Sequence, residues 1–332
     1  MKLTATILDD ELDDMNLVEY VFVNEMSLEH LLSNLTYLEI PYIYDYFKSI
    51  VMPTLPPSMH SLYLGSTDDN DPFFESLLTR LTNLKRLGLE YTSLNEQDYT
   101  YFKATRFTTL VSLALCHVEL DDNILIINFD NFPNLKDLVI AENGEIQFIG
   151  VSKITALTIS DLGFKLNTLK VDQFPELRIL KVKHFYNLRV QQLRELFSFP
   201  NLTSLTIKTY SCDLLLLQEV FIKQNTNLIK LKIHGFSLGS YFYNFITKHC
   251  PNLMVYILNR CEFIDDIKFN RKNVNLNLNL IEIANCEEGY GFNEHVKWLL
   301  ENSKNLKKII IDDTNLPFNL IDKYSNIIEF DA

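Results

Sequence analysis

One short pattern recurs along nearly the whole chain of 332 residues: an apolar residue, two variable residues, an apolar residue, a variable residue and a further apolar residue. Leu84-Lys-Arg-Leu87-Gly-Leu89 is a clear copy. Copies start about 24 residues apart on average, a period typical of stacked structural repeats rather than of independent globular domains. The thirteen copies start at Leu35, Met59, Leu84, Leu110, Leu135, Ile154, Leu177, Leu202, Leu228, Leu253, Leu278, Leu306 and Ile327.

Each copy predicts one β-strand, because its second and third apolar residues stand two apart and therefore share one strand face. A Pro-Asn-Leu sequence, as at Phe132-Pro-Asn-Leu135, often precedes the strand, and proline forces an extended start. Helical spacing of apolar residues predicts helices between strands at 213–224 and 293–302. The predicted fold is an α/β solenoid with a parallel sheet on its concave face, and with helices and irregular turns on its convex face.

The repeats also predict how the chain is divided. We expect an N-terminal cap at 1–34, a solenoid at 35–320 and a C-terminal cap at 321–332. Residues 141–176 are expected to be irregular, because the segment after 140 is too short for two turns and a helix. The acidic segment Asp9–Asp14 leaves an alternative open, namely that it covers a basic surface of the chain as a latch.

The position eight residues after the leading apolar residue holds Asn143, Cys261 and Cys286, with Thr92 and Thr314 in other copies. Together with the spacing and the His249-Cys250-Pro-Asn-Leu253 helix end, these residues resemble leucine-rich-repeat proteins, which form horseshoes. The cysteines resemble the cysteine-containing arrays of yeast F-box receptors. Phe185, Tyr210 and Phe236 depart from that pattern, and 1–34 shows no recognisable F-box.

Charge and composition exclude several classes of partner. The net charge is −13, from 30 basic and 43 acidic residues, which disfavours broad binding to nucleic acid or to an anionic membrane. The sequence has no uninterrupted apolar run of membrane-spanning length. The five cysteines are odd in number and scattered, so they do not predict a secreted disulfide framework. We therefore expect a cytoplasmic or nuclear protein.

No catalytic motif and no cofactor-binding loop stands out. A zinc set of His249, Cys250, Cys261 and Cys286 is conceivable, but the last two occupy turn positions that require a small buried residue, and a structural role is favoured. The acidic pairs favour helix caps or solvated turns over metal or acid–base sites. They are Asp121-Asp122, Asp265-Asp266 and Asp312-Asp313. We expect no catalytic, metal or cofactor site.

The strongest functional feature is a group of basic residues at matching positions of neighbouring repeats. Residues two, four and six positions after the leading residue face the concave side, and in the repeats at Leu177, Leu202 and Leu228 five of these nine are lysine and none is acidic. We call this set the basic stripe. It consists of Lys181, Lys183, Lys208, Lys230, Lys232 and His234. It predicts a binding surface for an acidic or phosphorylated protein segment. The alternative is chance clustering on a solvated strand face.

The sequence therefore predicts a non-enzymatic protein-interaction module. The resemblance to F-box receptors implies substrate recognition in ubiquitin-dependent degradation, with a Skp-type adaptor as a further partner. The alternative function is that of a structural scaffold subunit in a larger intracellular complex.

Overall fold

The computed structural model describes residues 2–4, 35–43, 53, 55–67, 73–120, 124–141, 145–160, 169–185, 196–213, 227–238, 246–263, 276–286, 292–311 and 318–330. The chain divides into two compact units. Unit 1 comprises Met1–Ile154 and Gly163–Thr168, and unit 2 comprises Thr155–Leu162 and Leu169–Ala332.

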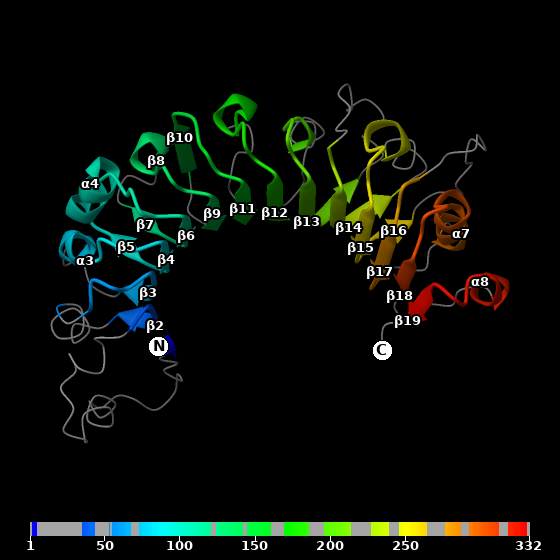
Figure 1. The fold of residues 1–332 in the computed structure, drawn as a ribbon, viewed down its shortest axis with the longest axis horizontal. Coiled ribbons are helices and arrows are strands. Elements are labelled where there is room, and N and C mark those ends of the chain that lie inside the picture. Colours follow the sequence, from blue (N-terminus) through cyan, green and yellow to red (C-terminus); the bar gives the residue numbers. More distant parts are fainter. Residues whose placement is uncertain are drawn as a thin grey trace, which may run out of the picture. The chain divides into compact units, whose positions relative to one another are not determined.

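Unit 1 contains a parallel sheet in which each strand pairs with the next repeat. Its strands are β1 (Lys2–Thr4), β2 (Tyr37–Ile43), β3 (Ser61–Thr67), β4 (Arg86–Glu90), β6 (Ser112–Cys116) and β9 (Asp137–Ala141). Helices α3 (Phe74–Arg80) and α4 (Glu96–Ala104) lie on one side of this sheet (Figure 1). The connections also contain two short parallel pairs and a 3₁₀ turn. These are β5 (Ser93–Leu94) with β7 (Glu119–Leu120), β8 (Ile124–Asn128) with β10 (Glu145–Ile149), and η3 (Phe129–Asn131).

Unit 2 repeats the arrangement. Its strands are β11 (Ala156–Ser160), β12 (Ile179–Phe185), β13 (Ser204–Asp213), β14 (Lys230–Leu238), β15 (Val255–Asn259), β17 (Leu280–Ala284), β18 (Lys308–Ile311) and β19 (Ile328–Phe330), each parallel to its neighbour. The short strand β16 (Glu262–Phe263) pairs with the end of β14. The connections contain η5 (Val171–Gln173), α7 (Phe292–Asn302) and α8 (Phe318–Lys323). Helices α7 and α8 lie on one side of the strands (Figure 1).

The core of each unit consists of the apolar residues of the repeat. In the repeat at Leu177, the leading leucine, Leu180 and Val182 are all fully buried, whereas Lys181 between them is exposed. The same positions align in register from strand to strand, as in the pairing of Leu180 with Leu205. Every repeat therefore adds its apolar face to that of its neighbours. This arrangement confirms the predicted leucine-rich-repeat solenoid.

The connecting segments agree with the sequence in part. Helix α7 matches the helix predicted at 293–302, with Val296 and Leu299 buried as expected. The helix predicted at 213–224 lies outside the described residues, apart from residue 213 at the end of β13. The connections described between residues 141 and 176 contain the strand β10 and the turn η5. The outer strand β8 begins earlier, at Ile124, and nothing in the spacing predicted it.

The strands of the two long parallel sheets are here called the inner strands. Many of them end in a residue whose backbone has a left-handed conformation. The residue seven positions after the leading one has a positive φ in six repeats, at Tyr91, His117, His184, Gly235, Arg260 and Asn285. For a non-glycine residue this backbone costs about 1–2 kcal/mol. Main-chain hydrogen bonds to the next repeat help to offset that cost, as from the Tyr91 N–H to the Cys116 carbonyl at 2.9 Å. The turn then directs the following residue, such as the buried Cys261, into the core.

Replacing Gly235 by alanine should lower the free energy of unfolding by more than about 2 kcal/mol. A Cβ at Gly235 would lie 2.1 Å from the Thr209 carbonyl oxygen, so the change adds a main-chain clash to the cost of φ +77. Gly150 is the matched control, because it has φ +82 but its added Cβ meets nothing closer than 3.7 Å. Gly150→Ala should cost only about 1 kcal/mol. Urea denaturation of both variants measures this, and equal costs would contradict the proposed clash.

Candidate functional site

The structure places the basic stripe on three neighbouring strands of unit 2. The face of each sheet that carries the residues two, four and six positions after the leading one is called its open face. Pairing aligns Lys181 with Thr206, and Thr206 with Lys232, in one row across β12, β13 and β14. A second row pairs Lys208 with His234. Lys181 and Lys230 are exposed, while Lys183, Lys208, Lys232 and His234 are half-buried.

The charge of the stripe is not neutralised within the described part of the chain. The open-face residues of β11 to β15 include no carboxylate, and the first acid in the row of Lys232 is Glu282 on β17, beyond Ile257. None of the five stripe lysines forms an ion pair with a described residue. By contrast, Lys308 on β18 pairs with Glu329. The stripe therefore presents positive charge that no described carboxylate on the neighbouring strands compensates.

The pKa of His234 reflects burial and the charges around this residue at one end of the stripe. Its pKa is lowered from the ordinary value by burial in the first place, and then by the positive charges of Lys208, Arg260 and Lys232. A hydrogen bond with the Asn259 side chain acts in the opposite direction. The imidazole is therefore mainly neutral at pH 7, among cationic side chains from adjacent strands.

Sequence reasoning missed Arg260 as a member of this cluster. The alternation of a strand assigns positions two, four and six to the open face, whereas Arg260 stands at position seven and has a φ of 50°. Its side chain is exposed, and its charge acts on His234. The only signal available was Gly235 at the equivalent position of the preceding repeat, which suggests a special backbone there.

The residues eight positions after each leading residue are here called the turn ladder, and its cysteines Cys261 and Cys286 contribute to the packing between repeats. The Cys261 N–H donates to Cys286 Sγ at 3.4 Å, and the Cys261 thiol donates to the carbonyls of Ile233 and Asn259. Thr92 occupies the same position in unit 1, where its hydroxyl donates to the Gly65 carbonyl. These contacts support the structural reading of the ladder. Among the described residues, no group of three or more metal-ligating side chains lies close enough to hold an ion.

Burial makes the thiols of Cys250 and Cys261 poor nucleophiles. It raises the pKa of Cys250 to about 12. It also raises the pKa of Cys261 well above the ordinary value, with a further contribution from the neighbouring Cys286. Cys116 differs from these thiols because it is only half-buried.

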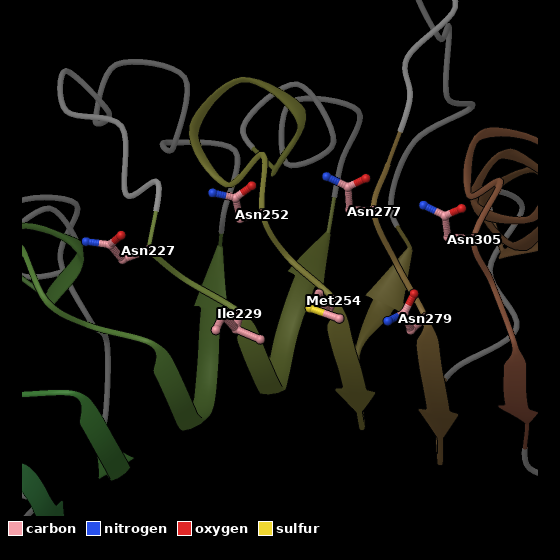
Figure 2. A pocket seen from close by; sticks show the side chains of 7 residues that line it. All are labelled: Asn227, Ile229, Asn252, Met254, Asn277, Asn279 and Asn305. Carbon is pink, nitrogen blue, oxygen red and sulfur yellow. The ribbon is translucent and has the colours of Figure 1, made fainter.

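A groove of about 490 Å³ crosses the amino-terminal ends of four strands in unit 2 (Figure 2). A row of asparagines lines it, one from the position before each leading residue: Asn227, Asn252, Asn277 and Asn305. Ile229, Met254 and Asn279, from the position after the leading residue, complete the lining. Asn277 Nδ2 donates to the Pro251 carbonyl of the preceding repeat at 2.9 Å, and Asn227 Nδ2 donates to Pro200 at 2.7 Å. The same bond recurs from Asn201 to Pro175. The asparagine before the leading residue thus links one repeat to the next.

The open face of unit 1 has a different character. Glu39, Glu90 and Asp137 lie on it, as the register predicts, with Arg86 on β4. The Tyr37 hydroxyl donates to Glu39 at 2.5 Å, which raises the pKa of Tyr37 to about 12. Tyr63 on β3 lies against Gly88, where no side chain intervenes.

Several predicted features lie outside the described residues. They are the acidic segment Asp9–Asp14, Asn143, Thr314 and the pairs Asp121-Asp122, Asp265-Asp266 and Asp312-Asp313; for Phe185 and Tyr210 the backbone alone is described. No described helix has the length and apolarity needed to cross a membrane.

Comparisons with known proteins add little to this picture. No protein-family description matches the chain, and no curated protein matches it. Twenty-two chains of solved structures match. One is the crystal structure of a TLR13-ssRNA13 complex, with 13% sequence identity and a TM-score of 0.27, over 86% of this chain and 55% of that chain. The chain thus spans about half the length of that neighbour. The fold assignment rests on the register and burial of this chain's own repeats.

Replacing Asn277 by alanine should lower the free energy of unfolding by about 1 kcal/mol, because a hydrogen bond between repeats is lost. Asn305 is the matched control. It occupies the same position in its repeat, and the described residues offer it no hydrogen bond. Asn305→Ala should therefore cost less than half as much in urea denaturation. Equal costs would show that the linking bond contributes nothing.

Iodoacetamide at pH 8 should modify Cys116 in the folded protein at least about 100-fold faster than Cys250 or Cys261. The thiolate is the reactive species, and burial both raises the thiol pKa and blocks access. Peptide mass spectrometry follows each site separately, and labelling in urea is the control that should equalise the rates. Rapid labelling of Cys261 in the native protein would overturn the structural reading of the turn ladder.

Proposed function

We propose that this chain is a non-enzymatic protein-interaction module whose basic stripe binds an acidic or phosphorylated segment of a partner protein. The observation that carries the proposal is the stripe itself, with five lysines in aligned rows and no described carboxylate among them. A partner laid across β12 to β14 gains charge-assisted hydrogen bonds without reordering of the sheet.

An acidic protein fits the stripe better than nucleic acid does. Single-stranded nucleic acid is bound by aromatic side chains that stack on bases, combined with a long cationic groove. The described open-face positions of β11 to β15 carry no Phe, Tyr or Trp. The whole chain carries a net charge of −13, which repels a long polyanion beyond the stripe.

Two observations support a role without catalysis. The neighbouring described thiols of Cys261 and Cys286 form hydrogen bonds with main-chain groups: Cys261 donates to the Ile233 carbonyl, and Cys286 accepts from the Cys261 N–H. His234, the imidazole of the stripe, lies among the cations Lys208, Lys232 and Arg260, and the described open-face positions of β11 to β15 carry no carboxylate. The cysteines thus suit a role in packing, and the surroundings of His234 suit the binding of an anion.

The finer proposal is that the bound partner is a substrate for ubiquitin-dependent degradation. It is supported by the turn ladder of Cys261 and Cys286, the feature shared with cysteine-containing F-box arrays. A Skp-type adaptor would then be a second partner. The alternative is a scaffold subunit of a larger complex, which has no need of that adaptor. A cytoplasmic or nuclear location stays a prediction. Affinity purification at low and moderate salt separates the two roles by recovery of the adaptor and a cullin.

Reversing the charge of Lys181, Lys208 and Lys232 to glutamate should weaken binding of a fluorescent hexaglutamate peptide more than about 100-fold, because each lysine loses a charged contact. The matched control reverses Lys153, Lys170 and Lys304, which are exposed and lie off the open face. It makes the same change in net charge and should leave the affinity within about twofold.

Fluorescence anisotropy measures both affinities, and circular dichroism checks that both variants remain folded. Equal loss in both variants would mean that net charge alone attracts the peptide. Unchanged binding in the first variant would remove the stripe from the proposal. A single-stranded RNA of equal charge serves as a competitor, and its tighter binding would favour nucleic acid over protein.

A further inference from the structure

We propose that Lys208, Lys232, His234 and Arg260 form a subsite for one phosphoryl group, so that the partner segment carries a phosphoserine or a phosphothreonine. This inference rests on the proposed function and specifies the chemistry of its partner. It also adds Arg260, which the stripe as defined from the sequence did not contain.

The register of three strands brings these groups together. Lys208 on β13 pairs with His234 on β14, and His234 pairs with Asn259 on β15. Neighbouring strands lie about 4.8 Å apart, so these three residues form a short row across the sheet. Lys232 lies two residues before His234 and shares its face. Arg260 follows Asn259, and its left-handed backbone turns the chain at the end of the strand.

The positive charges of the cluster favour the binding of a dianion. His234 faces Lys208 from β13, Lys232 from its own strand and Arg260 from the end of β15, and all three charges lower its pKa. Asn259 from β15 supplies a hydrogen bond. The carboxylate on the remaining element beside β14, Glu262 of β16, accepts a hydrogen bond from the Ser237 hydroxyl at 3.0 Å. The cluster thus combines cationic groups from three strands.

A phosphoryl group fits this set better than a carboxylate does. It carries a charge of about −1.5 to −2 at pH 7 and three strong acceptor oxygens, whereas a carboxylate carries one charge on two oxygens. Arg260 offers a planar fork of donors, Lys208 and Lys232 offer point charges, and His234 offers a ring N–H. Three oxygens can therefore be shared among four donor groups from adjacent strands.

The experiment compares three peptides on the full chain. They share one acidic sequence and differ at a central position that is phosphoserine, glutamate or serine. The phosphoserine peptide should bind at least about tenfold more tightly than the glutamate peptide. Arg260→Gln should abolish this preference while leaving the glutamate peptide within about twofold. Arg260→Lys, which keeps the charge but removes the fork, should retain part of the preference.

Proton linkage provides a second readout. A bound dianion raises the pKa of His234, so binding takes up a proton and becomes tighter as the pH falls. Sulfate is the probe, because it remains a dianion from pH 8 to pH 6. Its affinity should rise over that range, and the His234 resonance should titrate at higher pH in saturating sulfate. His234→Asn should remove the pH dependence. No shift of the His234 titration would overturn the subsite.

The outcomes separate this inference from the proposed function. Equal affinities for the phosphoserine and glutamate peptides, with both lost in the Lys181, Lys208 and Lys232 variant, would overturn the subsite and leave the acidic dock standing. Failure of all three peptides to bind would overturn both. A single-stranded RNA that binds more tightly than the phosphoserine peptide, and that also depends on Arg260, would overturn the assignment to a phosphoprotein.

Discussion

Stacking between repeats is the constraint on which the rest of this structure depends. A single repeat contributes only a few apolar side chains, and these are buried because the same positions of the next repeat cover them. Main-chain bonds fix the stacking: the N–H groups of Ile229 and Lys230 both donate to the Thr203 carbonyl, and the next repeat repeats the arrangement. The asparagine bond from Asn227 to Pro200 adds a side-chain link at the same edge. A shift of register in one strand would break all of these contacts together.

The fixed register of the strands also determines where the side chains of the open face lie. Strand pairing decides which of these side chains are neighbours. Lys181, Thr206 and Lys232 are in one row because Leu180, Leu205 and Leu231 are in another, on the buried side. Order imposed by the core reduces the entropy lost when a partner binds. The side chains of the stripe are thus positioned by residues on the opposite, buried face of the sheet.

The apolar pattern predicted the inner strands and their faces, because burial of residues such as Leu180 and Val182 dominates the choice of conformation there. It predicted α7 for the same reason. It did not predict the outer pair β8 and β10, because short, mainly apolar segments such as Ile124–Asn128 are compatible with either a strand or a buried helix segment. The left-handed residue that recurs at the ends of inner strands was also missed. That conformation is set by main-chain bonds to the next repeat, and side chains as different as Tyr91, His117 and Arg260 adopt it.

Local and overall charge act over different ranges in this chain. The excess of acidic residues sets the field at a distance, where it repels polyanions in general. At physiological salt that field is screened within about 8 Å, so a segment that reaches the sheet experiences mainly the side chains beside it. Around His234 these are cationic. Under the proposed function, a compact anion gains the full attraction of the cluster, whereas an extended polyanion reaches beyond the cluster into the field of an acidic chain. Local clustering of charge in an acidic chain thus favours a partner with one concentrated negative group.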